Sequence, residues 1–413
     1  QAISAYHDRF AELAPTPNID RIAHEGALFK HSYVVNSICA PARANILTGV
    51  HSHKNGVLDN RIPISFDQPT FPAILRENGY TTAVFGKWHI KTKPEGFDEF
   101  KILIGQGQYF NPDYRIKDGD GEKTVQLEGY STDRTTTEAL NFIKANKDSG
   151  QPFMVMFQYK APHGPWSPAF RNMELLRDVE IPEPPTFNDG YRGRKAAAIS
   201  KMTILGNFVG ERFNRLLKGD PASSHYGRLS EEELQRAKNF FGYENRRITK
   251  GDLRETALKK EKYQRYIHDY LRTVQGNDQN VGRILDYLDE SGLAENTLVC
   301  YSSDQGFYLG EHGWYDKRFM YNESFFTPLL MRWPGHIEPN TVVEELVQNI
   351  DMAPTFLSLG KAPVPDVMQG EDLTPLLYGI KPQQWRSHVY YHFYESYDTT
   401  HAVPKHEGVF DGR

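Results

Sequence analysis

The stretch "ENTLVCYSSDQG", residues 295–306, decides the fold class of this chain. It reads as a short buried strand that ends in the polar residues Asp304 and Gln305. It closely follows residues 258–292, where apolar side chains recur at steps of three and four residues, the period of an amphipathic helix. A long helix followed by a buried strand is typical of an α/β domain.

The same alternation recurs outward from this stretch. "TFPAILRENG" (70–79) predicts a helix closed by glycine, and "YTTAVFGKWHI" (80–90) predicts the strand after it. "DRTTTEALNFIKANK" (133–147) predicts a helix, and "PFMVMFQYKAPHGPW" (152–166) predicts a buried strand that runs into a loop. We therefore expect an α/β fold.

Two regions depart from this alternation. Residues 170–257 are polar, contain prolines and arginines, and predict a helical insertion that caps one side of the domain. From about residue 380 the sequence becomes rich in aromatic and β-forming residues, as in "HVYYHFYESY" (388–397). We therefore expect a main domain over 1–379 and, over 380–413, the start of a small C-terminal α+β subdomain with an antiparallel sheet, within which the chain stops.

Composition and cysteine count exclude several classes of protein. The 413 residues carry a net charge of −5 without a dominant basic run, which argues against nucleic acid as a partner. The longest apolar runs, such as "PFMVMF" (152–157), are too short to span a membrane. The two cysteines cannot form a disulfide framework. A Cys39–Cys300 bridge is possible in principle, but Cys300 is better explained as a small buried hydrophobe.

The first candidate for chemistry is "SICAPARANILTG", residues 37–49. Pro41 suits the first turn of a helix and Gly49 suits its C-terminal cap, so Cys39 stands at a helix start, where unpaired N–H groups favour an anion. Arg43, four residues on, lies on the same helix face. The pattern fits a nucleophile beside an anion-binding group. A buried thiol with an incidental arginine is the alternative, which spacing alone favours.

Two further groups follow predicted strands. Lys87 and His89 in "FGKWHI" are two residues apart and therefore share one face of a strand, where they are suited to anion binding and proton transfer. His163 in "YKAPHGPW" lies in a loop between two prolines, which restrict the backbone and so fix the position of the histidine. Trp166 lies nearby in the sequence. Taken alone, Lys87 and His89 are equally well explained as solvated residues at a strand end, and a lone loop histidine such as His163 is more often structural.

The fourth group surrounds Asp304 and Gln305. Carboxylate and amide oxygens are hard ligands suited to Ca²⁺ or Mg²⁺, and His312, Lys317 and Arg318 follow soon after. "SDQG" alone is equally compatible with a turn. Because ligands of open α/β sheets bind beyond the carboxyl ends of the strands, we expect all four groups to meet in one crevice. Such a site suits an ester of a tetrahedral oxyacid.

These residues resemble the blocks of the formylglycine-dependent sulfatase family. "CAPARANILTG" is similar to the family's cysteine signature, and "GKWH", "APH" and "SDQG…DKR" are similar to its other active-site blocks, in the same order. The resemblance implies an alkaline-phosphatase-like sandwich with a large central mixed sheet flanked by helices. It also implies that a maturing enzyme oxidises Cys39 to formylglycine, whose hydrate attacks the sulfur of a sulfate ester.

The resemblance assigns a role to each residue. It implies that Asp304, Gln305 and the modified Cys39 hold one divalent cation, with Ca²⁺ favoured. It implies that Arg43 stabilises the formylglycine hydrate, Lys87 and Lys317 bind sulfate oxygens, His89 acts as the base for sulfate release, and His163 acts as the general acid.

One feature of the family is not found here. Its members carry two adjacent aspartates on a first strand before the cysteine, which complete the metal site. Before Cys39 this chain has only isolated aspartates such as Asp8 and Asp20, and the latter lies in "TPNIDRIA", which resembles the helix after that strand. We therefore expect the first strand to be missing from this chain.

The later blocks resemble bacterial sulfatases that act on 6-sulfated N-acetylglucosamine in glycosaminoglycans such as heparan sulfate. This implies a sulfated oligosaccharide as partner and export to the periplasm. The candidate sugar contacts are His312, Arg318, Trp166, His392, Glu395 and His406. Three alternatives stay open: another sulfated sugar or position, a phosphonate or phosphate monoester hydrolase on the same site, and an inactive glycan-binding protein.

Overall fold

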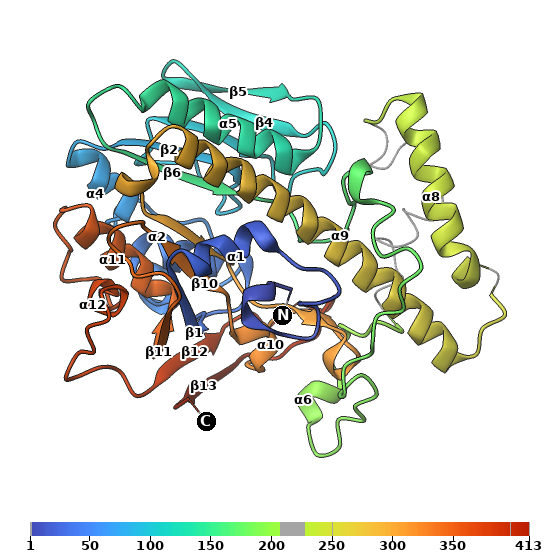
Figure 1. Cartoon of the computed structure of the whole chain (residues 1–413). Helices are drawn as coiled ribbons and strands as arrows, with labels where there is room; N and C mark the ends of the chain where they lie inside the picture. The colour runs from blue at the N-terminus through green and yellow to red at the C-terminus, as the bar shows by residue number, and fades with distance from the viewer. Residues whose placement is uncertain (1, 207–227, 250, 397, 413) are drawn as a thin grey trace.

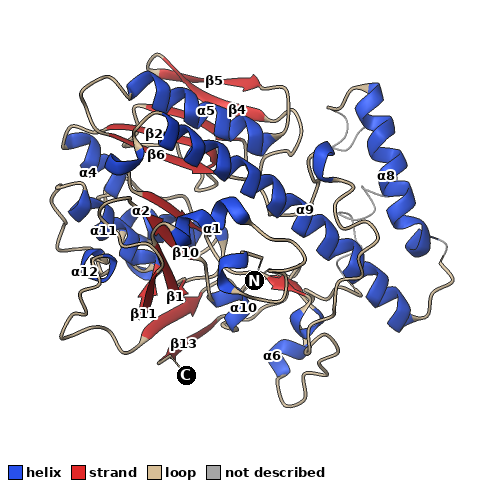
Figure 2. Cartoon of the chain, in the orientation of Figure 1, coloured by secondary structure: helices blue, strands red, loops and turns tan. Residues whose placement is uncertain are grey.

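The predicted helix and strand that decide the fold class are both present. The computed structural model describes residues 2–206, 228–249, 251–396 and 398–412 (Figure 1). The long helix is α9 (Glu255–Glu290), and after the short turn η4 (Ala294–Asn296) the strand is β7 (Val299–Ser302). The α/β fold is confirmed, and Figure 2 shows helices against the faces of the sheets.

One sheet has five strands in the order β5–β4–β3–β2–β6. Its strands are β2 (Thr81–Lys87), β3 (Glu99–Leu103), β4 (Asp113–Asp118), β5 (Gly121–Gln126) and β6 (Phe153–Gln158). β2 runs parallel to β3 and β6, whereas β4 is antiparallel to both β3 and β5. The sheet is therefore mixed, as expected, and β6 is one of its edges.

The second sheet has four strands in the order β11–β1–β10–β7. Beside β7 it contains β1 (Ala27–Tyr33), β10 (Leu329–Arg332) and β11 (Thr341–Gln348). β1 is parallel to β11, and β10 is antiparallel to both β1 and β7. This sheet is mixed as well, and β7 is one of its edges.

Helices flank both sheets (Figures 1 and 2). α5 (Ser131–Asn146) packs against β2, β6 and the long helix α9. α1 (Pro17–His24) packs between α9 and β10 and contains "PNIDRIAH". The other helices are η1 (Ser4–Tyr6), α2 (Cys39–Thr48), α3 (Ser52–Asn55), α4 (Phe71–Glu77), α10 (Asn322–Phe325), η6 (Asn349–Asp351), α11 (Met352–Leu359) and α12 (Thr374–Leu377).

Two glycines set local geometry beside the site. Gly49 adopts φ +67 and its N–H donates to the Asn45 carbonyl, which ends α2 as predicted. Gly86, at φ +90 in β2, lies so close to β6 that a Cβ there would be 2.1 Å from the Gln158 carbonyl oxygen. Glycine at this position therefore brings the ends of β2 and β6 together.

The insertion and the C-terminal segment have the expected character where they are described. Between 170 and 257 lie η2 (Phe170–Asn172), α6 (Lys195–Ala198) and α8 (Glu231–Thr249), and α8 packs on α9. Residues 207–227 and 250 of the predicted insertion lie outside the described residues. β12 (Val389–Phe393) and β13 (His406–Phe410) form the expected small antiparallel sheet. The boundary at 379/380 stays a prediction.

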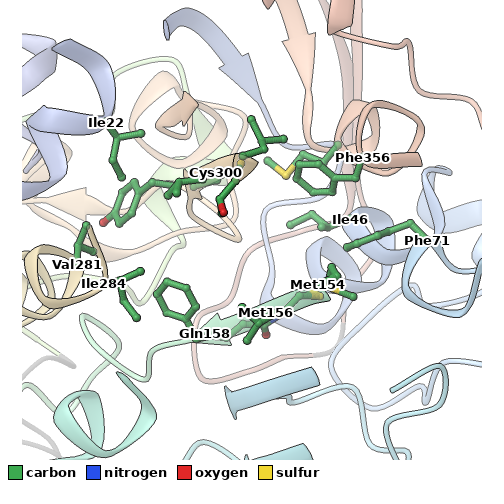
Figure 3. A pocket seen from close by; sticks show the side chains of 18 of the residues that line it. Ile22, Ile46, Phe71, Met154, Met156, Gln158, Val281, Ile284, Cys300 and Phe356 are labelled. Carbon is green, nitrogen blue, oxygen red and sulfur yellow. The ribbon is translucent and has the colours of Figure 1, made fainter. Parts of the chain in front are cut away.

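A cavity of about 1020 Å³ separates the two mixed sheets. Figure 3 shows Met154 and Met156 of β6 on one side and Cys300 of β7 on another. Both strands read as continuous apolar runs, which predict burial on both faces. In the structure every residue of both strands is only half-buried. The two edges that face the cavity have no partner strand among the described residues.

Within the described ranges, no helix combines the length and the apolar character that crossing a bilayer requires.

Candidate active site

Cys39 is the buried centre of the site. It is the first residue of α2, 1% exposed, and follows Ile38 in an extended conformation. Lys87 Nζ lies 3.7 Å and Gln305 Nε2 lies 3.9 Å from its Sγ. Both cysteines are free, so the weaker possibility of a Cys39–Cys300 bridge is not realised. Cys300 lines the cavity, and burial raises the pKa of its thiol to about 12.

The electrostatic environment of Cys39 favours an anion. Burial opposes a charged sulfur, but Lys317, Lys87 and the two histidines together outweigh it, and the pKa of the Cys39 thiol lies well below its usual range. Both lysines are buried, at 3% and 2% exposure. They come from distant parts of the chain: Lys87 ends β2, and Lys317 follows β9 (Tyr315–Asp316), which pairs with β8 (Tyr308–Leu309).

Arg43 connects three parts of the site. Its Nε donates to Asp304 Oδ2 at 2.9 Å, and its Nη1 donates to the Lys87 carbonyl and to the Gln158 side chain. The guanidinium therefore connects α2 to the carboxyl ends of β2, β6 and β7. A planar fork of donors suits such a position better than a single ammonium group. Arg43 thus orients the groups around Cys39.

Two histidines face Cys39, as the sequence predicted. His163 and His89 each favour a charged Cys39 sulfur and so lower the pKa of its thiol. The His163 loop contains two cis peptide bonds, Ala161–Pro162 and Gly164–Pro165, and Nδ1 of His163 lies 2.9 Å from the Gly164 carbonyl oxygen. That carbonyl only accepts, so Nδ1 carries the proton and Nε2 is left to face Cys39. Burial and Lys87 lower the pKa of His163 to about 3.

His89 follows β2 in a left-handed conformation, with φ +60. Burial lowers its pKa, so that it is neutral at neutral pH and able to accept a proton. Its Nε2 lies 3.0 Å from the side-chain amide of Gln106. The Nδ1 atom is buried and has no hydrogen-bond partner among the described residues.

The expected metal ligands lie together beside Cys39, but they form only part of a site. Gln305 is 7% exposed, and its Oε1 is buried without a hydrogen-bond partner in the described part of the chain. Asp304 has one oxygen occupied by Arg43. No cluster of three or more His, Cys, Asp or Glu side chains suited to a metal occurs among the described residues. Since Ca²⁺ takes six to eight oxygen ligands, these residues fit it as a partial set.

Of the six candidate sugar contacts, Arg318 and Glu395 lie together near Cys39 and Lys317. Arg318 is 5% exposed, and its Nε lies 3.6 Å from Glu395 Oε2. The charge of Cys39 influences the pKa of Arg318, which is raised by neighbouring carboxylates against the effect of burial. Glu395 belongs to the C-terminal segment, so that segment contributes a buried carboxylate beside the site.

The other four candidates have structural surroundings. His312 Nδ1 lies 2.7 Å from Asp189 Oδ2, and its ring packs among aromatic rings. Trp166 donates to the Pro162 carbonyl at 2.7 Å and packs on Tyr266, so it supports the His163 loop from behind.

His392 stacks on Tyr394 and pairs with Glu407 at 3.3 Å. His406 has both ring nitrogens in contact with the backbone, at Pro404 and Met320. Among the described residues, no hydrogen bond or ion pair joins His392 or His406 to Cys39 or to the lysines and histidines around it.

Sequence patterns did not single out Gln158, Gln106 or His401. Gln158 is the last residue of β6, and its side-chain oxygen accepts a hydrogen bond from Arg43. Its position at the carboxyl end of a predicted strand could have indicated a place in the site. Gln106 lies in a loop with no motif, yet it contacts His89. His401 contacts Asp316 next to Lys317 and comes from the C-terminal segment, 85 residues further on (401 − 316). Only the fold brings these residues to the site.

The site therefore places a buried cysteine at a helix start among two lysines and two histidines, an arrangement suited to a hydrolase for esters of tetrahedral oxyacids. The family model described as Sulfatase matches residues 2–362. The chain belongs to the sulfatase family and is a sulfatase.

Relatives of known name agree with this assignment. The chain is 42% identical over 423 residues to an N-acetylglucosamine-6-O-sulfatase of Bacteroides thetaiotaomicron. The alignment covers 99% of this chain and 74% of that protein. It is 27% identical over 394 residues to the human N-acetylglucosamine-6-sulfatase, covering 89% of this chain but only 61% of the human protein.

Solved structures share the fold. The structure of BT4656 in complex with its substrate D-glucosamine-2-N,6-O-disulfate superposes with a TM-score of 0.93 at 41% identity, covering 100% of this chain and 84% of that one. The phosphonate monoester hydrolase SpPMH from Silicibacter pomeroyi has a TM-score of 0.67 at 22% identity, covering 95% and 78%. The second likeness shows a common fold only.

Proposed function

We propose that this sulfatase removes the 6-O-sulfate of an N-acetylglucosamine-type sugar in glycosaminoglycan oligosaccharides. The 42% identical relative with that name, and the structural relative with its disulfated glucosamine, support this substrate class. The observation that carries the chemistry is the position of Cys39, with Lys87 Nζ 3.7 Å from its Sγ and Lys317, His89 and His163 around it.

In this proposal the two lysines bind the sulfate. Their ammonium groups are buried, so their attraction to sulfate oxygens is screened less than it would be at the surface. Lys317 is held by Asp316, whose Oδ1 lies 2.9 Å from Nζ, and Lys87 lies at the fixed end of β2. The charge that develops on the sulfate during transfer is therefore met by donors already in place.

Cys39 stands where the nucleophile is needed. Oxidised to formylglycine by a maturing enzyme and hydrated, it would supply a hydroxyl group for attack on sulfur. Arg43 and Gln305 hold the position of that group from two sides: Arg43 through the ends of three strands, and Gln305 through its amide 3.9 Å from Sγ.

The two histidines divide the proton transfers. His163 directs Nε2 toward Cys39, from where it would donate a proton to the sugar oxygen that leaves sulfur. Its low pKa reflects burial and Lys87, and the negative charge of a bound sulfate ester would oppose that lysine and raise the pKa. His89, neutral and partnered by Gln106, would act as the base that frees the product sulfate.

A divalent cation is the proposed cofactor, with Ca²⁺ favoured. Asp304 and Gln305 would hold it, since Gln305 Oε1 is a buried acceptor that lacks a hydrogen-bond partner among the described residues. When bound, the cation would stabilise negative charge on the sulfate. The remaining oxygen ligands would come from outside these two residues.

We propose the cavity between β6 and β7 as the place of the expected first strand with its two aspartates. Three observations support this placement. The cavity is bounded by two strand edges, those strands are apolar yet half-buried, and Asp304 and Gln305 line the cavity. A strand there would join the two sheets into the single large central sheet that the family resemblance implies.

Export to the periplasm is likewise a proposal, to be checked by cell fractionation.

The test is a desulfation screen of matured enzyme, co-expressed with a formylglycine-generating enzyme, on defined 2-, 3-, 4- and 6-sulfated saccharides. We expect sulfate release from 6-sulfated N-acetylglucosamine and 6-sulfated glucosamine, and none from the Cys39→Ala variant. Release from another position only would overturn the substrate claim. Faster turnover of aryl phosphonate than of aryl sulfate esters would favour the phosphonate hydrolase, and an unmodified thiol at Cys39 in the native host would favour an inactive binding protein.

A further inference from the structure

A second histidine–carboxylate group lies behind the catalytic lysine. His401 is 8% exposed; its Nε2 lies 2.9 Å from Asp316 Oδ2, and its Nδ1 is in close contact with Asp398 Oδ2. The ring is therefore placed between two carboxylates, one next to Lys317 and one in the C-terminal segment. Lys201 N–H donates to the His401 carbonyl oxygen at 2.9 Å, which fixes the backbone of this residue as well.

Asp316 links His401 to the two cationic side chains Lys317 and Arg318. It is 4% exposed, and its Oδ1 lies 2.9 Å from Lys317 Nζ and 3.0 Å from Arg318 Nη1. Asp316 and Arg318 have φ angles of +76 and +107, in the region that side-chain-bearing residues rarely adopt. Such a backbone persists only where its surroundings hold it. The contact with His401 is one of the interactions that hold it.

Arg318 is poised to bind a further group. Its Nε is buried and lacks a hydrogen-bond acceptor within the described ranges, and Oε2 of Glu395, 3.6 Å from Nε, likewise lacks a donor. Asp398 Oδ2 lies 3.6 Å from Nη2. These separations are too long for good hydrogen bonds, so the guanidinium keeps free donors beside the catalytic group.

We propose that His401, as an imidazolium, is a positioning residue that holds Lys317 and Arg318 in place for the sulfated substrate through Asp316. A neutral imidazole has one N–H and would leave a lone pair facing one of the two carboxylates. Only the imidazolium donates from both nitrogens, to Asp316 and to Asp398 at once. His401 thus connects the C-terminal segment to the catalytic loop without touching substrate.

The charges around His401 agree with this geometry. The charged groups around it are Asp316, Asp398, Arg318 and, through its effect on the pKa of Glu395, that carboxyl as well. Burial and Arg318 disfavour the imidazolium, but the two carboxylates outweigh them and raise its pKa above 6.5. A raised pKa means that the proton is present below neutrality and is lost as the pH rises through the raised value. Substrate binding should therefore weaken on the alkaline side.

The experiment rests on the proposed sulfatase activity and measures kcat/KM against pH for matured enzyme with 6-sulfated N-acetylglucosamine. We expect an alkaline decrease in the native enzyme that moves to lower pH by about one to three units in Asp398→Asn, because one stabilising charge is removed. His401→Gln should lose this decrease and have a KM raised about tenfold at pH 6, since a charged hydrogen bond is lost. His388→Gln, an exposed histidine, should match the native enzyme.

An unmoved decrease in Asp398→Asn, or a native decrease in His401→Gln, would overturn the proposal. If no sulfated saccharide is turned over, the proposed function fails, but the role of His401 is still tested by NMR titration of its imidazole. We expect a pKa above 6.5 in the native protein and a lower value in Asp398→Asn. A native value at or below 6.5 would overturn the role of His401 independently of activity.

Discussion

Arg43 Nε lies 2.9 Å from Asp304 Oδ2, so the residue expected to stabilise the nucleophile is ion-paired with the residue expected to bind the cation. The pair joins α2 to the end of β7, across the chain from residue 43 to 304. Both side chains are mostly buried, at 12% and 14% exposure. One guanidinium would therefore position both the proposed cation at Asp304 and the proposed nucleophile at Cys39.

Replacing this guanidinium should impair activity more than folding. We expect Arg43→Lys to lower kcat/KM about 10²- to 10³-fold, because an ammonium cannot reach Asp304, Gln158 and the Lys87 carbonyl together. Its Tm should stay close to the native value, because the buried carboxylate keeps a cation nearby. Arg115→Lys, at a partly exposed ion pair in β4, is the matched control. If Arg43→Lys keeps the native kcat/KM, Arg43 is not required for positioning the nucleophile.

The general-acid role of His163 predicts a dependence on the leaving group. A sugar alkoxide needs a proton to leave, whereas a nitrophenolate does not. We expect His163→Ala to lower kcat/KM about 10²- to 10⁴-fold for a sugar 6-sulfate and far less for an aryl sulfate. His89→Ala should lower turnover of both substrates, because release of sulfate is common to them. Equal losses on both substrates in His163→Ala would assign the proton donor elsewhere.

His163 should also make the protein sensitive to acid. Its pKa is about 3 in the folded chain because burial and Lys87 disfavour the cation, against about 6.5 in the unfolded chain. Between these values the unfolded chain binds more protons, so the free energy of unfolding falls as the pH falls from 6.5 toward 3. We expect urea denaturation to show a shallower acid dependence in His163→Gln than in the native protein. Parallel curves would contradict the buried neutral histidine.

The sequence was a good guide wherever function rests on local pattern. The period of residues 258–292 predicted α9, and proline and glycine set the ends of α2 around Cys39. Lys87 ends one predicted strand and His163 follows another, and these strands, β2 and β6, are parallel neighbours in one sheet that bring their ends together. For these residues, secondary structure alone was enough to predict convergence.

Contacts between distant segments were beyond such reasoning. Nothing in the pattern around His312 separates a sugar ligand from a ring held by Asp189, and only packing decides. His401 carries no motif at all and meets Asp316 because β12 and β13 bring the C-terminal segment to the catalytic loop. Side-chain partners across subdomains depend on the whole topology, which short-range spacing does not encode.

Gly306 predicts how tightly the metal-ligand loop is packed. A Cβ there would lie 2.3 Å from the Glu323 carbonyl oxygen and 2.6 Å from that of Phe326, both backbone atoms. Gly306→Ala must displace the loop that carries Gln305, and we expect it to lower the free energy of unfolding by about 1–3 kcal/mol and to reduce kcat/KM. Gly242→Ala, inside α8 with no atom within 4 Å, should instead be neutral or stabilising by up to about 1 kcal/mol. Urea denaturation of both variants measures their free energies of unfolding. Equal values for Gly306→Ala and Gly242→Ala would contradict the close packing at Gly306.

The cavity between β6 and β7 predicts that this chain accepts an extended strand. Because both edges are apolar, half-buried and without a partner strand in the described ranges, a peptide with an apolar run followed by two aspartates should bind there and raise Tm. Its aspartates would lie beside Asp304 and Gln305, so Ca²⁺ should raise Tm further with the peptide than without it. The matched control is the same peptide with both aspartates replaced by asparagine, which should bind but lose the calcium effect. Thermal unfolding measured with each combination tests this, and an identical Tm in all of them would show that the cavity does not take a strand.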